Sequence, residues 1–145
     1  MLWWYCMDKS NFNNLLIMAC ATNFITPHVR GTWFYGVEMI FSNINEDLTK
    51  TPINLTGYGV LINLKLSENS PVTYEFKTED STITITDAVN GKIMLEPRGD
   101  LNVIGNYLYS IYLIDTSDRL VPFFSDYWQI VENPAPPTSY TIINE

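Results

Sequence analysis

The side chains that could do chemistry in this sequence are few and scattered. His28 is the only histidine among 145 residues. A single imidazole cannot build a site with several histidine ligands, and a serine triad would also have to use it. The sequence has no GxSxG elbow and no glycine-rich phosphate loop. We therefore predict no catalytic residue, no cofactor and no metal ligand, and expect His28 to be a packing or surface residue.

Carboxylates and thiols leave other possibilities open. Two acids about 5–10 Å apart suffice for a glycosidase, but no spacing among the sixteen Asp and Glu residues reveals such a pair. Cys6 and Cys20 form no CxxC motif, so free thiols are favoured over a disulfide. Asn43, Asn45 and Asp47 are similar to a calcium loop, but its glycine and glutamate are missing, so calcium is not expected.

Aromatic and loop residues suggest two kinds of binding. Aromatic rings stack on sugars, so a carbohydrate-binding platform is one interpretation of Trp33, Tyr35, Tyr127 and Trp128. The alternative is that these rings fill the core, as aromatic side chains on strands usually do. Residues 98–100 read Arg-Gly-Asp, which is similar to an integrin-binding sequence, although a loop turn is sufficient to explain them.

The composition excludes several partners. The net charge is -8, and the eight basic residues are scattered. Phosphate binding needs clustered Lys and Arg, so we expect no nucleic acid partner. A membrane-spanning helix needs about 20 apolar residues, and no such run occurs, so we expect no membrane partner. Charged residues make up only 17% of the chain, which favours either surface hidden in an assembly or a tyrosine-rich β-sandwich.

Residues 101–115 carry the clearest structural pattern. Tyr107, Tyr109, Ile111 and Leu113 occupy alternate positions. Alternate side chains of a strand point to the same face, so this set can face a core. We take this strand as the one around which the other elements pack.

The start of the same strand has the spacing of a tyrosine corner, in Leu101, Gly105 and Tyr107. In that feature a tyrosine near the start of a strand hydrogen-bonds to backbone a few residues upstream, in an immunoglobulin-like sandwich. The further strands that we expect cover residues 32–41, 53–66, 72–78, 81–87, 92–96 and 120–131. Seven short strands separated by turns predict an all-β fold, an immunoglobulin-like antiparallel β-sandwich.

Details of these strands are also predicted. In residues 53–66, the pattern places Tyr58, Val60, Ile62, Leu64 and Leu66 on one face. In the other strands, the pattern places Val72, Tyr74, Phe76, Ile83 and Ile85 inward. Asn90 and Gly91 are expected to supply the left-handed dihedrals of a tight hairpin. Pro122 indicates an edge strand or a bulge.

The two ends of the chain differ from the middle. We assign residues 1–30 to an N-terminal arm, 31–132 to the sandwich and 133–145 to a proline-rich extended tail. Ser10 can cap a short helix over residues 11–19. We expect no secretory signal, because Lys9 is the only basic residue before the apolar run that begins at Leu15, Asp8 balances its charge, and the run is short. Met18 is an alternative start.

The apolar residues at both ends are the predicted partner-binding residues. The arm packs either on its own domain or on a neighbour, since exposed aromatic rings are a liability on a free monomer. The tail can add a strand to another sheet. The predicted partner-binding residues are Leu2, Trp3, Trp4, Tyr5, Phe12, Tyr140, Ile142 and Ile143.

Four motifs in order resemble those of one family. They are RGTW at 30–33, PINLTGY at 52–58 with Asn54 in place of the usual aspartate, DAVNGKI at 87–93, and GNYLYSIYLID at 105–115. This order resembles the immunoglobulin-like N-terminal domains of phage baseplate upper proteins and related tail or neck proteins. The resemblance covers about two thirds of the chain.

The resemblance implies a function without catalysis. It implies a non-enzymatic virion component of a tailed phage, in the baseplate, tail, neck or capsid surface, assembled in the host cytoplasm. Its expected partners are other virion proteins and copies of itself in a symmetric ring or lattice. The alternative is a carbohydrate-binding module of a host-recognition device, and a hydrolase with spatially paired acids is a further rival.

Overall fold

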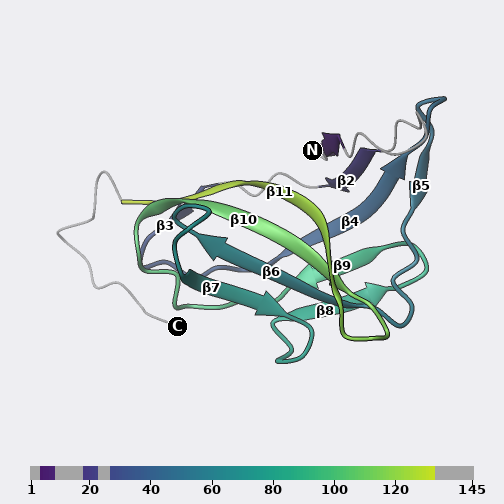
Figure 1. The fold of residues 1–145 in the computed structure, drawn as a ribbon. Coiled ribbons are helices and arrows are strands. Elements are labelled where there is room, and N and C mark those ends of the chain that lie inside the picture. Colours follow the sequence, from purple (N-terminus) through teal and green to yellow (C-terminus); the bar gives the residue numbers. More distant parts are fainter. Residues whose placement is uncertain (1–3, 9–17, 23–26, 133–145) are drawn as a thin grey trace.

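A computed structural model describes residues 4–8, 18–22 and 27–132 of the chain. These residues form strands joined by turns (Figure 1). The strands are β1 (Trp4–Asp8), β2 (Met18–Thr22), β3 (His28–Val29), β4 (Val37–Ile44), β5 (Lys50–Pro52), β6 (Gly59–Lys65), β7 (Val72–Lys77), β8 (Ile83–Asp87), β9 (Lys92–Leu95), β10 (Gly105–Ile114) and β11 (Leu120–Val131).

The strands form two sheets. One has the order β3-β11-β10-β6-β7, and the other has the order β1-β2-β4-β9-β8, with β5 also paired to β4. Neighbouring strands are antiparallel, except that β3 runs parallel to β11. The series β4-β9-β8 packed against β7-β6-β10-β11 matches the B-E-D and C′-C-F-G strands of an immunoglobulin-like sandwich. The all-β sandwich is therefore confirmed.

The sandwich contains more strands than the seven expected. Nine strands, β3 to β11, lie between residues 28 and 131. The strands that the sequence pattern missed are β3, which has two residues, and β5, which has three exposed residues. Such short segments carry no readable alternation of apolar and polar side chains.

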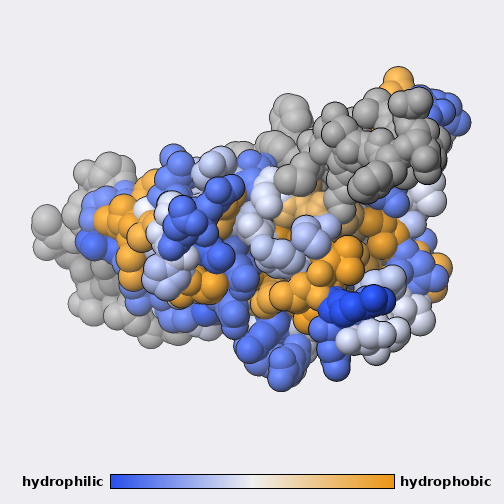
Figure 2. Space-filling view, in the orientation of Figure 1, coloured by the Kyte–Doolittle hydropathy of each residue, from blue (hydrophilic) through white to orange (hydrophobic). Residues whose placement is uncertain are grey.

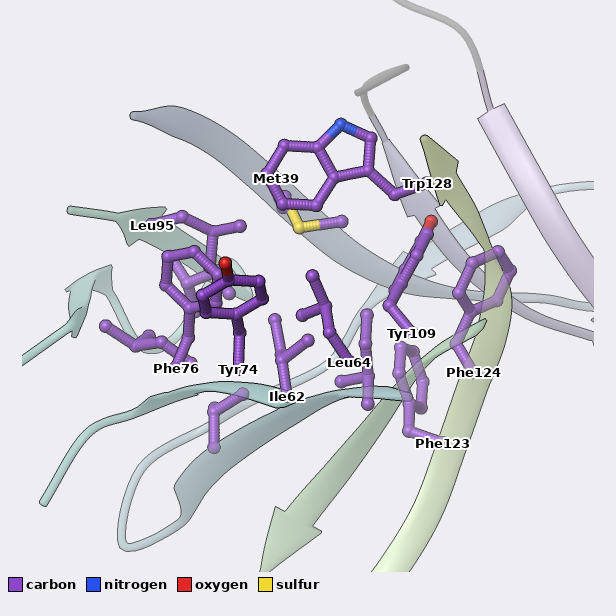
Figure 3. Close-up of a cluster of buried hydrophobic side chains, with 14 of the residues drawn as sticks. Met39, Ile62, Leu64, Tyr74, Phe76, Leu95, Tyr109, Phe123, Phe124 and Trp128 are labelled. Carbon is purple, nitrogen blue, oxygen red and sulfur yellow. The ribbon is translucent and has the colours of Figure 1, made fainter. Parts of the chain in front are cut away.

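Strand β10 is the central element, as its pattern predicted. Tyr107, Tyr109, Ile111 and Leu113 are all at most 7% exposed. On the neighbouring strand β6, the predicted alternation also holds. Figure 3 shows side chains from the two sheets meeting in this core. The core residues drawn there with labels are Met39, Ile62, Leu64, Tyr74, Phe76, Leu95, Tyr109, Phe123, Phe124 and Trp128.

The ends of two strands were predicted wrongly. Tyr58 and Leu66 are 38% and 51% exposed, because β6 begins after the first and ends before the second. Val72, at the start of β7, is 40% exposed, whereas Tyr74 is buried as expected. Alternation shows which side chains of a strand face the core, but it does not show where the pairing with neighbouring strands ends.

The strand predicted from residue 32 begins instead at Val37. Gly36 has a φ of 90° and interrupts the extended chain before β4. Phe34 forms an isolated bridge with Arg98 and packs into the core. The aromatic run at 33–35 therefore precedes the sheet rather than belonging to it.

Pro122 lies at a bulge, as predicted. The register of β10 against β11 shifts so that Ile111 faces Phe124 and Tyr112 faces Pro122. Phe123 is the additional residue, and both Phe123 and Phe124 are buried. A bulge places two residues opposite one, so two consecutive phenylalanines can both enter the core.

The N-terminal segment contributes strands to the sandwich sheet. β2 is antiparallel to β4, and β1 is antiparallel to β2. The last two residues of the predicted helix 11–19 lie in β2, and the rest fall outside the described residues. The sandwich also begins before residue 31, because β3 pairs with β11 at residues 28 and 29.

Candidate functional site

A tyrosine corner forms where β10 begins. The hydroxyl of Tyr107 donates a hydrogen bond of 2.7 Å to the carbonyl of Val103. The hydroxyl of Tyr74 accepts hydrogen bonds from the amides of Asn102 and Val103, at 3.0 Å each. Burial raises the pKa of Tyr107, so this hydroxyl keeps its proton at neutral pH. The predicted corner is confirmed, and a second tyrosine reinforces it.

Arg98 holds the segment that leads into this corner. Its Nε and Nη2 donate to the two carboxylate oxygens of Asp100 at 2.6 and 2.7 Å, and its Nη1 donates to the carbonyl of Glu75 at 2.7 Å. The guanidinium also lies 4.7 Å from the ring centroid of Phe76. The hydrogen bond to Asp100 raises the pKa of Arg98 and lowers that of Asp100. The Arg-Gly-Asp triplet therefore serves the fold through its arginine.

Three apolar side chains are exposed around the corner. Leu66, Val103 and Ile104 are 51%, 49% and 44% exposed. Leu66 extends over Gly105, where an added Cβ would lie 2.5 Å from its Cδ2. We call these three residues the end patch. Figure 2 shows apolar surface in separate patches, at the left end and towards the centre of the molecule.

The predicted sugar-binding platform is not assembled. Trp128 is 2% exposed and contacts the ring of Phe34 at 5.4 Å between centroids, so it is a core residue. Tyr127 precedes it on β11 and is 63% exposed, because successive strand residues face opposite sides. Trp33 and Tyr35 are 40% and 78% exposed. The core alternative is thus confirmed for Trp128.

His28 lies in the same aromatic cluster. It is 7% exposed, and its ring is 5.9 Å from Phe34 and 6.2 Å from Trp128 between centroids. Its Nε2 is buried without a hydrogen-bond partner among the described residues. Burial lowers the pKa of His28, and a hydrogen bond with the backbone of Thr32 opposes this in part. The predicted packing role is confirmed.

We expect stability to fall in mild acid because of this histidine. Its pKa is lowered in the fold, so between that value and 6.5 the unfolded chain binds more protons than the folded chain. The free energy of unfolding should therefore decrease below pH 6.5, with a slope of up to about 1.4 kcal/mol per pH unit. Urea unfolding between pH 7.5 and about 5 measures this slope, in a range above that where carboxylates titrate.

His28→Phe is the matched control for this pH dependence. It keeps an aromatic ring and removes the titration, so its stability should be nearly constant over the same range. An equal slope in both proteins would assign the pH dependence to other groups.

Three acids of the sandwich, Glu79, Asp115 and Asp118, line one open depression. This depression, of about 540 Å³, is lined by Gly57, Gly59, Thr78, Glu79, Ile114, Asp115, Thr116 and Asp118. Asp115 accepts hydrogen bonds from the amides of Arg119 and Ser117, and these lower its pKa. A general acid needs a raised pKa, so Asp115 is a turn-forming residue. In residues 27–132 and the two arm strands, no three His, Cys, Asp or Glu side chains gather as metal ligands would.

The residues predicted to bind partners are only partly described. Trp4 and Tyr5 lie in β1, opposite Thr22 and Ala21 of β2. Among the described strands, β1 is at one end of its sheet and β8 is at the other. The predicted partner-binding residues outside the described part of the chain are Leu2, Trp3, Phe12, Tyr140, Ile142 and Ile143. No helix of the described residues is long and apolar enough to cross a membrane.

Sequence reasoning missed the end patch. Val103 and Ile104 fall in a segment without alternation, and Leu66 was placed in the core. The available signal was two consecutive β-branched residues before the glycine of a tyrosine corner, where the chain crosses between sheets. Comparison with known proteins adds no relative, since no family model and no curated protein matches this chain.

Proposed function

We propose that this protein is a non-enzymatic structural component of a tailed-phage virion that binds neighbouring virion subunits and further copies of itself. The order of motifs at residues 30–33, 52–58, 87–93 and 105–115 supports this proposal. The sandwich with its tyrosine corner is the fold that this resemblance implies. Its position would be the baseplate, tail, neck or capsid surface, after assembly in the host cytoplasm.

The observation that carries the proposal is the position of β1 and β2 at the end of one sheet. β1 and β2 continue the sheet of β4 and end in β1 as an outer strand. β4 and β5 extend together away from the body of the sandwich, on the side where β2 lies (Figure 1). The outer strand of a sheet presents backbone donors and acceptors to another chain, and strand addition is a common mode of docking.

The surface and charge fit an assembly subunit. The end patch offers exposed aliphatic side chains at the opposite end of β10 from the β10–β11 turn. Exposed apolar side chains that gather in one place are a common feature of protein interaction sites. The net charge of -8 disfavours packing against nucleic acid and leaves protein partners as the expected ligands.

Deletion of residues 1–17 tests this function, because it removes β1 and leaves β2 to β11. We expect the truncated chain to unfold cooperatively near the temperature of the full chain and to lose association. Light scattering after size exclusion measures self-association. Incorporation into particles, in a phage that encodes this chain, measures binding to other virion proteins.

Three results would contradict the proposal. The first is unchanged incorporation of the truncated chain into particles. The second is a full-length chain that stays monomeric at all concentrations and is missing from purified particles. The third is loss of cooperative unfolding in the truncated chain, because the sandwich itself would then need β1.

A further inference from the structure

The two cysteines of the chain are paired by strand register. In the antiparallel pair of β1 and β2, Cys6 is the direct partner of Cys20. Cys20 also lies opposite Ser42 of β4 on its other side. These are the only two cysteines among 145 residues. Thirteen residues separate them in sequence, so this pairing comes from the register of the hairpin and not from a short motif.

Direct partners in an antiparallel pair have the separation that a disulfide needs. Their Cα atoms are about 4.5 Å apart at a non-hydrogen-bonded site and about 5.5 Å apart at a hydrogen-bonded one. Disulfides span Cα separations of about 4.4–6.8 Å. Both kinds of site are therefore compatible with a bond, whereas a shift of one residue would send one side chain to the other face of the sheet.

We propose that Cys6 and Cys20 form a cross-strand disulfide when the protein meets a disulfide oxidant such as oxidised glutathione. The thiolate of one cysteine attacks the oxidant, forms a mixed disulfide and releases one reduced glutathione. The thiolate of the other cysteine then attacks the protein sulfur of this mixed disulfide and releases the second. Two protein thiols lose two electrons and two protons, and one oxidised glutathione becomes two reduced molecules.

The bond would make the outer strand a permanent part of its own sheet. It would close the loop between β1 and β2 covalently, and β2 is paired to β4. In a reducing cytoplasm both thiols stay free. Exposure to an oxidising medium would then link β1 to β2 through the disulfide. This inference depends on the register alone and not on the proposed virion function.

The test uses the purified full chain in glutathione buffers of increasing oxidation. We expect an intramolecular disulfide, seen as a mass loss of about 2 Da and the loss of both thiols to alkylation. The bond should form at a rate independent of protein concentration. Reduction with dithiothreitol should restore both thiols.

Matched controls move one thiol by a single position. Cys20→Ser combined with Ala21→Cys, and Cys20→Ser combined with Ala19→Cys, keep nearly the same sequence separation from Cys6 but lose the register. We expect both variants to oxidise at least about tenfold more slowly when folded, and as fast as the parent chain in denaturant. Equal oxidation of parent and shifted variants when folded would overturn the proposal. Disulfide-linked dimers alone, or thiols that stay reduced in fully oxidised glutathione, would also overturn it.

Discussion

Gly91→Ala is expected to lower the free energy of unfolding by about 3–5 kcal/mol, which is the sum of a left-handed backbone penalty and a steric clash. Gly91 has a φ of 68°. A Cβ at this position would lie 2.5 Å from the carbonyl oxygen of Phe41 and 2.8 Å from that of Ile53. Both of these atoms are backbone, so neither can move aside as the end of a flexible side chain would.

The neighbours of Gly91 are also fixed by hydrogen bonds. The amide of Phe41 donates to the carbonyl of Gly91 at 2.9 Å, and the amide of Ile53 donates to the carbonyl of Phe41 at 3.0 Å. Moving either strand to admit a methyl group would break this ladder. These hydrogen bonds therefore hold the turn between β8 and β9 in place against β4.

Gly31→Ala is the matched control for this prediction. Gly31 has a φ of 81°, but nothing lies within 4 Å of an added Cβ. Only the backbone penalty applies, so we expect a loss of about 1–2 kcal/mol. Urea unfolding of the two variants measures the difference. Equal losses would show that the contact with Phe41 and Ile53 relaxes freely.

Trp128→Ala is expected to cost about 3–5 kcal/mol, the range found for truncating a buried tryptophan. Trp128 is 2% exposed and packs on the rings of Phe34 and His28 at the junction of β11 and β3. The cavity left by the indole lies between these elements and the facing sheet, which is held by its own ladders. Chemical denaturation measures the loss.

Tyr127→Ala tests the opposite face of the same strand. Tyr127 is 63% exposed, so we expect a change of at most about 0.5 kcal/mol, as for most surface substitutions. If Trp128 belonged to a sugar-binding platform, Trp128→Ala would instead leave the free energy of unfolding unchanged and abolish sugar binding. That outcome would contradict its assignment to the core.

The strands and the corner were predictable because they depend on local patterns. Tyr107 to Leu113 alternate over a long run, and this alternation reports directly on burial. The hydrogen bond from Tyr107 to Val103 follows from the spacing of a recurrent feature. Pro122 likewise indicated an edge strand or a bulge, since proline cannot donate to a ladder, and the bulge is present.

Features set by contacts between distant segments were not predictable. Gly36 has a positive φ between the aromatic residues and β4, and a Cβ there would lie 2.5 Å from the carbonyl oxygen of Leu95, which is far away in sequence. Asn90 was expected to share the left-handed turn with Gly91, but only Gly91 has a positive φ. Asn90 instead donates to Asp87 through its amide and its side chain. The four residues between β8 and β9 form a longer loop than the tight hairpin expected.

The candidate site was the least predictable part. Alternation placed Leu66 on the core face, and no local pattern decided between a sugar-binding platform and the core for Trp128, yet Trp128 is buried and Leu66 is exposed. The difference is that β3 and Phe34 cover Trp128, while Leu66 lies beyond the last pairing of β6. The facing of Cys6 and Cys20 likewise required a register that no local motif encodes.

At the corner where β10 begins, the path of the loop is held by bonds to its main chain and not by its side chains. Both tyrosine hydroxyls bond to main-chain atoms of Asn102 and Val103, and the side chains of these residues take no part in those bonds. The identities of Val103 and Ile104 can therefore change while the path of the loop is kept. A related chain can therefore present different side chains at this end of the sandwich through a few substitutions, with little loss of stability.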